Sequence, residues 1–219
     1  MSISRKFLLI VGSTCAIVIF GLLLSHHRQP VGDYPALRSV RPDTWAAPVD
    51  QSFNLYRMTP RLYRSALPGG RDLPLLEQLQ VKTVVSFIKD NDAEWLGESS
   101  IERISIPLHA DRVNDADVIR VLHILQDKQA DGPVLMHCKH GRDRTGLMAA
   151  MYRTVIQGWS KQEALDEMRN GGYGDAQDMD DATRYVENAD VEKIRDAFVN
   201  GECSTTWLST CYVRNWLTQ

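Results

Sequence analysis

Apolar and polar positions along the chain alternate in ways that predict both strands and helices. Residues 81–88 are rich in β-branched side chains, which is typical of a buried strand, and residues 101–106 alternate as a second strand does. Residues 118–125 place apolar side chains at helical spacing after an Asn-Asp-Ala-Asp sequence that suits a helix start. Further strands are expected over 54–58, 62–65 and 133–136, and further helices over 73–79, 147–156, 161–169 and 182–198.

Strands that alternate with helices favour an α/β fold with a mostly parallel central sheet. The chain has 219 residues, enough for a sizeable core, and we expect one domain over residues 51–219 with helices on both faces of the sheet. The net charge of −3 comes from interspersed charges of both signs, so we expect no nucleic-acid partner. We also expect the domain to be a monomer.

The first 28 residues carry the pattern of an export signal. Arg5 and Lys6 precede residues 7–24, a stretch without any charged side chain. The stretch is long for a signal peptide and marginal for a membrane span, so residues 1–28 are either a cleaved signal or an uncleaved membrane anchor. A basic end that stays in the cytoplasm directs the rest across the membrane, and we therefore expect the domain outside the cytoplasm.

A proline-containing stretch separates this segment from the expected domain. Pro30, Pro35, Pro42 and Pro48 all lie within residues 29–50. Such a composition is typical of a linker, so the folded domain is expected to begin near residue 51.

Candidate chemistry lies in residues 137–146, which read His-Cys-Lys-His-Gly-Arg-Asp-Arg-Thr-Gly. They follow the apolar strand 133–136 and precede a helix, so backbone N–H groups of the loop can converge on a phosphate beside the helix N-terminus. Gly141 lets the backbone curl tightly. Arg144 offers a planar guanidinium that can hold two phosphate oxygens.

Cys138 is the candidate nucleophile of this loop. A helix N-terminus and nearby cations favour the thiolate, which can attack phosphorus and form a phosphocysteine intermediate. The hydroxyl of Thr145 is expected to assist departure of the sulfur, and Arg144 with the loop amides stabilises the transition state, so neither a metal nor a cofactor is expected. The alternative is an inert thiol buried in the core.

The reaction also needs a general acid to protonate the leaving oxygen. Asp111 follows the strand 101–106, at the edge of the sheet where the carboxyl ends of parallel strands share a ligand crevice. Asp115 and Asp117 are rival candidates, but acidic residues in the first turn of a helix have a structural explanation. We therefore favour Asp111.

Several polar residues of the loop have open roles. Lys139 and Arg142 are either solvated rim residues or recognise a more anionic substrate, and Asp143 would offset part of their charge, through a pair with Arg142. His140 is expected at the rim of the phosphate loop. His137 is expected to hydrogen-bond backbone near Cys138 and support it.

The sequence His-Cys-x-x-Gly-x-x-Arg-Thr-Gly resembles the signature of protein tyrosine phosphatases, and the short chain resembles their dual-specificity branch. The segments that resemble a periplasmic bacterial group of this family are 55–58, 81–90, 109–113 and 201–204. The resemblance implies a phosphotyrosine phosphatase with Asp111 as its acid. It also implies a periplasmic location, a phosphorylated protein substrate such as an inner-membrane diguanylate cyclase, and a role in biofilm control.

Cys203 and Cys211 lack neighbouring ligands for a metal site. In an oxidising compartment they could form a disulfide, and the alternative is two free buried thiols.

Two functions remain open besides a non-enzymatic phosphate-binding module. The favoured one is hydrolysis of phosphotyrosine, with or without phosphoserine and phosphothreonine. The alternative is a phosphoinositide or phospholipid phosphatase, because Cys-Lys-x-Gly-basic-x-Arg resembles the loops of phosphatases that act on inositol phospholipids.

Overall fold

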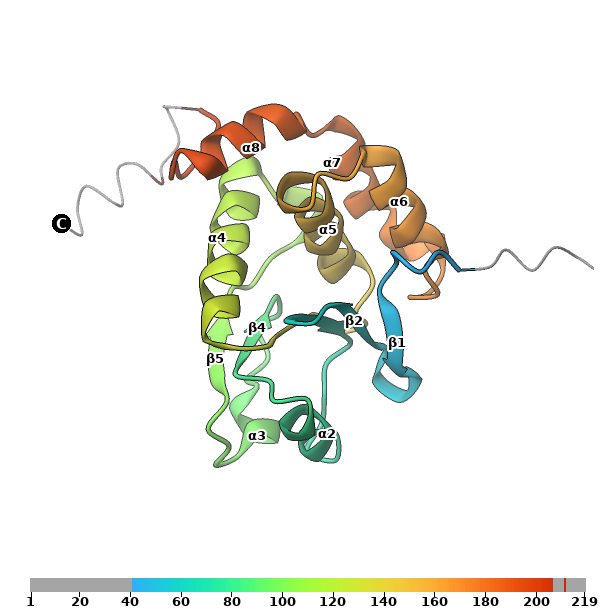
Figure 1. Cartoon of the computed structure of the whole chain (residues 1–219), viewed down its shortest axis with the longest axis vertical. Helices are drawn as coiled ribbons and strands as arrows, with labels where there is room; N and C mark the ends of the chain where they lie inside the picture. Colours follow the sequence, from blue (N-terminus) through green and yellow to red (C-terminus); the bar gives the residue numbers. More distant parts are fainter. Residues whose placement is uncertain (1–40, 207–210, 212–219) are drawn as a thin grey trace, which may run out of the picture. The chain divides into compact units, whose positions relative to one another are not determined.

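The computed structural model describes residues 41–206 and 211, and these residues build one six-stranded sheet in the order β1-β2-β3-β6-β4-β5 (Figure 1). Strands β1 to β3 pair antiparallel, whereas β3, β6, β4 and β5 pair parallel, so three of the five pairings are parallel. The expectation of a mostly parallel sheet is confirmed. The strands are β1 Ala47–Asp50, β2 Leu55–Thr59, β3 Leu62–Ser65, β4 Thr83–Ser86, β5 Glu102–Ser105 and β6 Val134–His137.

Helices pack against both faces of this sheet, as expected (Figure 1). They are α2 Leu73–Gln78, α3 Ala93–Leu96, α4 Asp115–Asp131, α5 Asp143–Met151, α6 Lys161–Asn170, α7 Asp180–Asn188 and α8 Val191–Val199. A π-helical turn, Tyr152–Ile156, continues α5, and short 3-10 turns occupy Gln51–Phe53, Ala110–Arg112 and Ala176–Met179.

The two central parallel strands are buried on both sides. Val85 and Met136 belong to the larger hydrophobic cluster, which packs beneath α4 to α8. Their neighbours Val84 and Leu135 point the other way, into a smaller cluster with α2 and α3. Successive side chains of a strand alternate between faces, and this explains why β4 and β6 read as continuous apolar runs.

The folded domain begins earlier than the sequence predicted, because β1 lies inside the range 29–50 expected to be a linker. The preceding residues are also tied to the domain. Arg41 donates hydrogen bonds to the carbonyls of Ala46 and Gly171, and the Ala46 N–H donates to Glu167 Oε1 at 2.5 Å. Prolines in this stretch suggested a linker, but its polar groups find partners in the domain.

The helix expected over 182–198 was wrong as a single element, since α7 ends at Asn188 and α8 begins at Val191. Asp190 explains the break, because its carboxylate accepts a hydrogen bond from the Lys193 N–H at 3.2 Å and caps the new helix. Within the part of the chain that the structure describes, no helix has the length and apolar character needed to cross a membrane. The export segment predicted at 7–24 lies outside the described residues.

Candidate active site

The loop 138–144, hereafter the phosphate loop, connects β6 to α5. Strand β6 ends at His137, in register with Ser65 at the end of β3 and Ser86 at the end of β4. The loop therefore lies at the carboxyl edge of the parallel strands, where ligand crevices form in such sheets. Cys138, the first loop residue, is only 2% exposed.

Close packing against β3 explains the glycine in this loop. Gly141 has φ +70°, and a Cβ atom there would lie 2.6 Å from the backbone of Ser65 and Ala66. Real Cβ contacts are not this short, so only glycine lets the phosphate loop lie against the end of β3.

Three successive carbonyls of the phosphate loop are held by the surrounding structure. The Leu67 N–H donates to Lys139 O at 3.3 Å, Asn54 Nδ2 donates to His140 O at 3.0 Å, and Arg64 Nη2 donates to Gly141 O at 2.8 Å. In a trans peptide the carbonyl and the following N–H point in opposite directions. The N–H groups of residues 140–142 therefore point away from these partners, into the concave side of the loop, where an anion can accept from them.

Arg64 and Asn54 were not singled out from the sequence. Arg64 is 1% exposed, and its guanidinium lies 3.6 Å from the centre of the Tyr173 ring. Asn54 has left-handed backbone, φ 57°, and also donates to Tyr173 O at 3.0 Å. Arg64 lies in β3 and Asn54 immediately precedes β2, so no local sequence pattern connects them with the loop that they support.

Arg144 lies in the first turn of α5 and reaches across the sheet edge. Its Nη1 atom donates to Phe87 O at 3.1 Å and to Leu108 O at 3.5 Å. Both acceptors lie in the loops that follow β4 and β5. The guanidinium is thus anchored on one side, and its partial exposure leaves it accessible to a bound phosphate.

A buried carboxylate contacts His137, the residue that precedes Cys138. His137 Nε2 lies 3.3 Å from Asp92 Oδ2, and the two side chains are 0% and 1% exposed. Trp95 Nε1 donates to the other Asp92 oxygen at 3.0 Å. Burial tends to raise the pKa of Asp92, but the hydrogen bond and charge of His137, with the bond from Trp95, lower that pKa overall.

This arrangement corrects the expected role of His137. A hydrogen bond to backbone near Cys138 was expected, whereas the partner is the Asp92 carboxylate, and the second ring nitrogen, Nδ1, is buried without a partner among residues 41–206 and 211. Asp92 was missed because it precedes α3 and reads as an ordinary acidic residue before a helix.

Asp111 lies in the 3-10 turn Ala110–Arg112, which packs against α5 and α7. Its side chain is 55% exposed and forms an ion pair with the neighbouring Arg112 at 3.6 Å. It lies near enough to Asp143 for its charge to contribute to raising the pKa of Asp143. Asp111 also lines a cleft of about 470 Å³ beside α7.

The rival acids have structural partners. The Asp115 carboxylate accepts from Tyr185 Oη at 2.9 Å and from Thr205 Oγ1 at 2.6 Å. Asp117 accepts from the Asn114 N–H at 3.2 Å and completes a capping box at the start of α4. These contacts give Asp115 and Asp117 structural roles, whereas the Asp111 carboxylate is exposed beside Arg112.

The rim of the loop is organised differently from the expectation. Arg142 forms an ion pair with Asp178, not with Asp143. Asp143 accepts from the Ala182 N–H at 3.3 Å, and burial raises the pKa of Asp143, with the charge of Asp181 contributing and the Ala182 bond opposing.

The remaining residues named from the sequence differ in exposure. Lys139 and His140 are exposed, so both lie at the rim. The Thr145 side chain is fully buried, and its hydroxyl has no hydrogen-bond partner within the described part of the chain.

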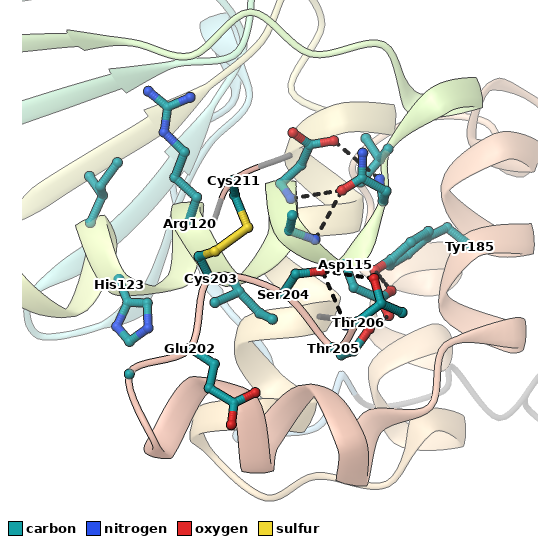
Figure 2. A pocket seen from close by; sticks show the side chains of 17 residues that line it. Asp115, Arg120, His123, Tyr185, Glu202, Cys203, Ser204, Thr205, Thr206 and Cys211 are labelled. Carbon is teal, nitrogen blue, oxygen red and sulfur yellow. Dashed lines mark hydrogen bonds between the residues drawn. A yellow bond between two sulfur atoms is a disulfide. The ribbon is translucent and has the colours of Figure 1, made fainter. Parts of the chain in front are cut away.

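A disulfide joins Cys203 and Cys211, with their Cα atoms 6.1 Å apart. It borders a cavity of about 990 Å³ between α4 and residues 201–206 (Figure 2). Asp115 and Thr205 meet at the wall of this cavity, but the described residues that line it include none of the phosphate loop. Despite its size, the cavity is therefore separate from the site around Cys138.

Comparisons with known proteins agree with this geometry. A family model described as the tyrosine phosphatase family matches residues 51–205. The dual specificity protein phosphatase TpbA of Pseudomonas aeruginosa (strain PAO1) is 58% identical over 181 residues, 83% of each chain. The crystal structure of a cysteine-to-serine variant of P. aeruginosa TpbA in complex with phosphotyrosine is 60% identical, with TM-score 0.73, and the match covers 74% of this chain and 99% of that one.

A more distant relative, an inositol diphosphatase of Arabidopsis thaliana, is 26% identical over 161 residues, 68% of this chain and 78% of the relative. The fold and the loop between β6 and α5 define a phosphatase domain. The chain belongs to the tyrosine phosphatase family, as an enzyme of its dual-specificity branch.

Proposed function

We propose that this protein hydrolyses phosphotyrosine in a protein substrate through a phosphocysteine intermediate. The observation that carries the proposal is the phosphate loop, which has three carbonyls bound to the surrounding structure, Cys138 at its start and Arg144 at its end. The TpbA complex adds support, because a protein that is 60% identical binds phosphotyrosine.

In the first step the thiolate of Cys138 attacks phosphorus and the bond to the tyrosine oxygen breaks. Asp111 gives its proton to the departing oxygen, while Arg144 and the loop N–H groups bind the other phosphate oxygens. In the second step Asp111 takes a proton from water, which attacks phosphorus and releases phosphate. The Thr145 hydroxyl, which is unpartnered within the described residues, hydrogen-bonds the sulfur as it leaves.

The nucleophile is tested by Cys138→Ser. We expect turnover of a phosphotyrosine peptide to be lost while the peptide still binds, because the phosphate loop and Arg144 remain. Retained turnover in a correctly folded variant would contradict the phosphocysteine mechanism.

The acid is tested by Asp111→Asn with two substrates. The phenolate of tyrosine needs protonation, whereas nitrophenolate leaves readily without it. We expect kcat to fall by about 100-fold or more for the peptide, and much less for nitrophenyl phosphate. Asp117→Asn is the matched control, because its carboxylate caps α4 and should not affect the leaving group. Equal slowing of both substrates by Asp111→Asn would remove Asp111 from this role.

We also propose that the enzyme acts in the periplasm on an extracytoplasmic part of a membrane protein, such as a diguanylate cyclase. The charge-free segment 7–24 supports export, and one solved relative is named a tyrosine phosphatase related to biofilm formation. Cell fractionation tests the location. The protein found only in the cytoplasmic fraction would refute it.

A second candidate function is hydrolysis of inositol phosphates or phosphoinositides. Lys139 and Arg142 favour it, as does the relative named an inositol diphosphatase. The pairing of Arg142 with Asp178 weakens it. Phosphotyrosine peptide, phosphoserine peptide, an inositol diphosphate and phosphoinositide vesicles, compared by kcat/KM, separate the two candidates.

A further inference from the structure

We infer that Asp178 determines specificity, because it holds Arg142 away from the substrate and biases the site toward ligands with one phosphate group. The inference rests on the proposed function, since it concerns the same phosphate loop. Arg142 is one of two rim cations, with Lys139, that could bind a second phosphate, and its guanidinium is paired with the Asp178 carboxylate.

The path of the Arg142 side chain is set by backbone as well as by charge. Gly174 has φ +140°, and a Cβ atom there would lie 2.0 Å from Arg142 Cδ. The arginine stem therefore occupies the space that any other residue at position 174 would fill. This contact directs the guanidinium along residues 171–182, hereafter the wall segment, and toward Asp178.

The wall segment is attached to the phosphate loop by contacts that do not involve the ion pair. Asn54 Nδ2 joins Tyr173 O to His140 O, at 3.0 Å from each, and the Ala182 N–H donates to Asp143 at 3.3 Å. These bonds lie on both sides of Asp178 in the sequence. They therefore position the backbone on either side of Asp178 near the phosphate loop independently of the ion pair.

The charges on the wall segment act in the same direction. Asp175, Asp180 and Asp181 accompany Asp178 on this segment, and of these three Asp181 forms an ion pair with Arg184 at 2.9 Å. A second phosphate group of a substrate would meet a neutralised arginine and several carboxylates. A phosphotyrosine carries its single phosphate into the loop between Cys138 and Arg144 and leaves Arg142 unused.

The size of the effect follows from exposure. The side chains of Arg142 and Asp178 are 27% and 53% exposed, so solvent screens their attraction. Pairs of this kind change an equilibrium by roughly 2- to 5-fold. We expect a change of that size in polyanion affinity, largest at low ionic strength.

Competitive inhibition tests the inference, with nitrophenyl phosphate as the reporter substrate. Inositol hexakisphosphate and inorganic phosphate are the two inhibitors. Asp178→Asn should lower the Ki of inositol hexakisphosphate by roughly 2- to 5-fold and leave the Ki of inorganic phosphate nearly unchanged. Asp175→Asn, a matched control on the wall segment, should change the ratio of the two Ki values less.

A second substitution identifies the cation responsible. Adding Arg142→Gln to Asp178→Asn should return the Ki ratio to that of the unmodified chain, because the released guanidinium is gone. An unchanged ratio in Asp178→Asn overturns the inference. The inference is also overturned if Arg142→Gln weakens binding of inositol hexakisphosphate by the same factor in the unmodified chain and in the Asp178→Asn variant. Failure of the proposed function would be distinct, since it would be seen as absent turnover of phosphotyrosine peptide.

Discussion

Replacing Gly141 with alanine tests how closely the phosphate loop packs against β3. The substitution adds one methyl group at φ +70°, directed at the Ser65 and Ala66 backbone from 2.6 Å. Ordinary contacts begin near 3.4 Å, so the phosphate loop or the strand end must move by about 0.8 Å. Neither neighbour is a flexible side chain that could rotate away.

Two costs follow, and they can be separated. The positive φ alone destabilises an alanine by about 1–2 kcal/mol. Displacement of the loop adds a catalytic cost, because misplacing reacting groups by about 1 Å can slow turnover by about 100-fold. We therefore expect a modest loss of stability together with a large loss of kcat.

The matched control is Gly158→Ala. Gly158 has φ +73°, nearly the same as Gly141, but a Cβ atom there would meet no atom within 4 Å beyond the adjacent residues. It should show the stability cost of the backbone conformation, a fall of roughly 2–8 °C in Tm, without any change in kcat. Thermal unfolding and nitrophenyl phosphate turnover, measured on both variants, give the comparison.

An equal loss of stability in Gly141→Ala and Gly158→Ala, with full kcat in both, would contradict this expectation. That result would mean that the phosphate loop has room for a methyl group, and that its position does not depend on contact with β3.

Three further predictions concern buried pairs and the disulfide. Asp92→Asn should destabilise the fold by about 1–3 kcal/mol at pH 7. The pKa of Asp92 in the folded protein lies below its ordinary value of 3.8. The loss of stability caused by Asp92→Asn should therefore be complete above pH 3.8 and disappear as the pH falls through the folded-state pKa. Denaturant unfolding at several pH values will check this. Glu167→Gln removes the carboxylate that holds buried Arg153 at 2.7 Å and should cost about 3–5 kcal/mol in the same assay; a loss below 1 kcal/mol would contradict the pairing. Cys203→Ser should lower stability by about 2–3 kcal/mol and abolish the effect of reductant on Tm, whereas a variant still sensitive to reductant would argue against the disulfide.

Much of the sheet and the chemical core of the site could be predicted because their signals are local. The strand β6, the loop with Cys138 and the start of α5 are consecutive in the sequence. The tight turn and the phosphate chemistry also restrict which residue types can occur there. The pattern can therefore be recognised in a single sequence. The apolar run of β4 and the alternating pattern of β5 are equally local signals.

The residues that hold the phosphate loop in place could not be found in this way. Arg64 and Asn54 reach Gly141 and His140 only through the folded sheet, across sequence separations of 77 and 86 residues. A buried arginine in an apolar strand also has no sequence signature. The direction of the Arg142 side chain depends on the glycine at position 174. The residues of the loop rim were therefore known from the sequence, but the neutralisation of Arg142 was not.

The attachment of Arg41 has a geometric consequence for any tethered form of the enzyme. Arg41 contacts Gly171 O and the Tyr173 hydroxyl, so the polypeptide enters the domain beside the wall segment. In an uncleaved chain held in a membrane by residues 7–24, only residues 25–40 would connect the membrane to the domain. At about 3.5 Å per residue, these residues can span at most about 55 Å. Phosphorylated sites beyond that height above the membrane would be out of range, whereas a cleaved enzyme could diffuse to them.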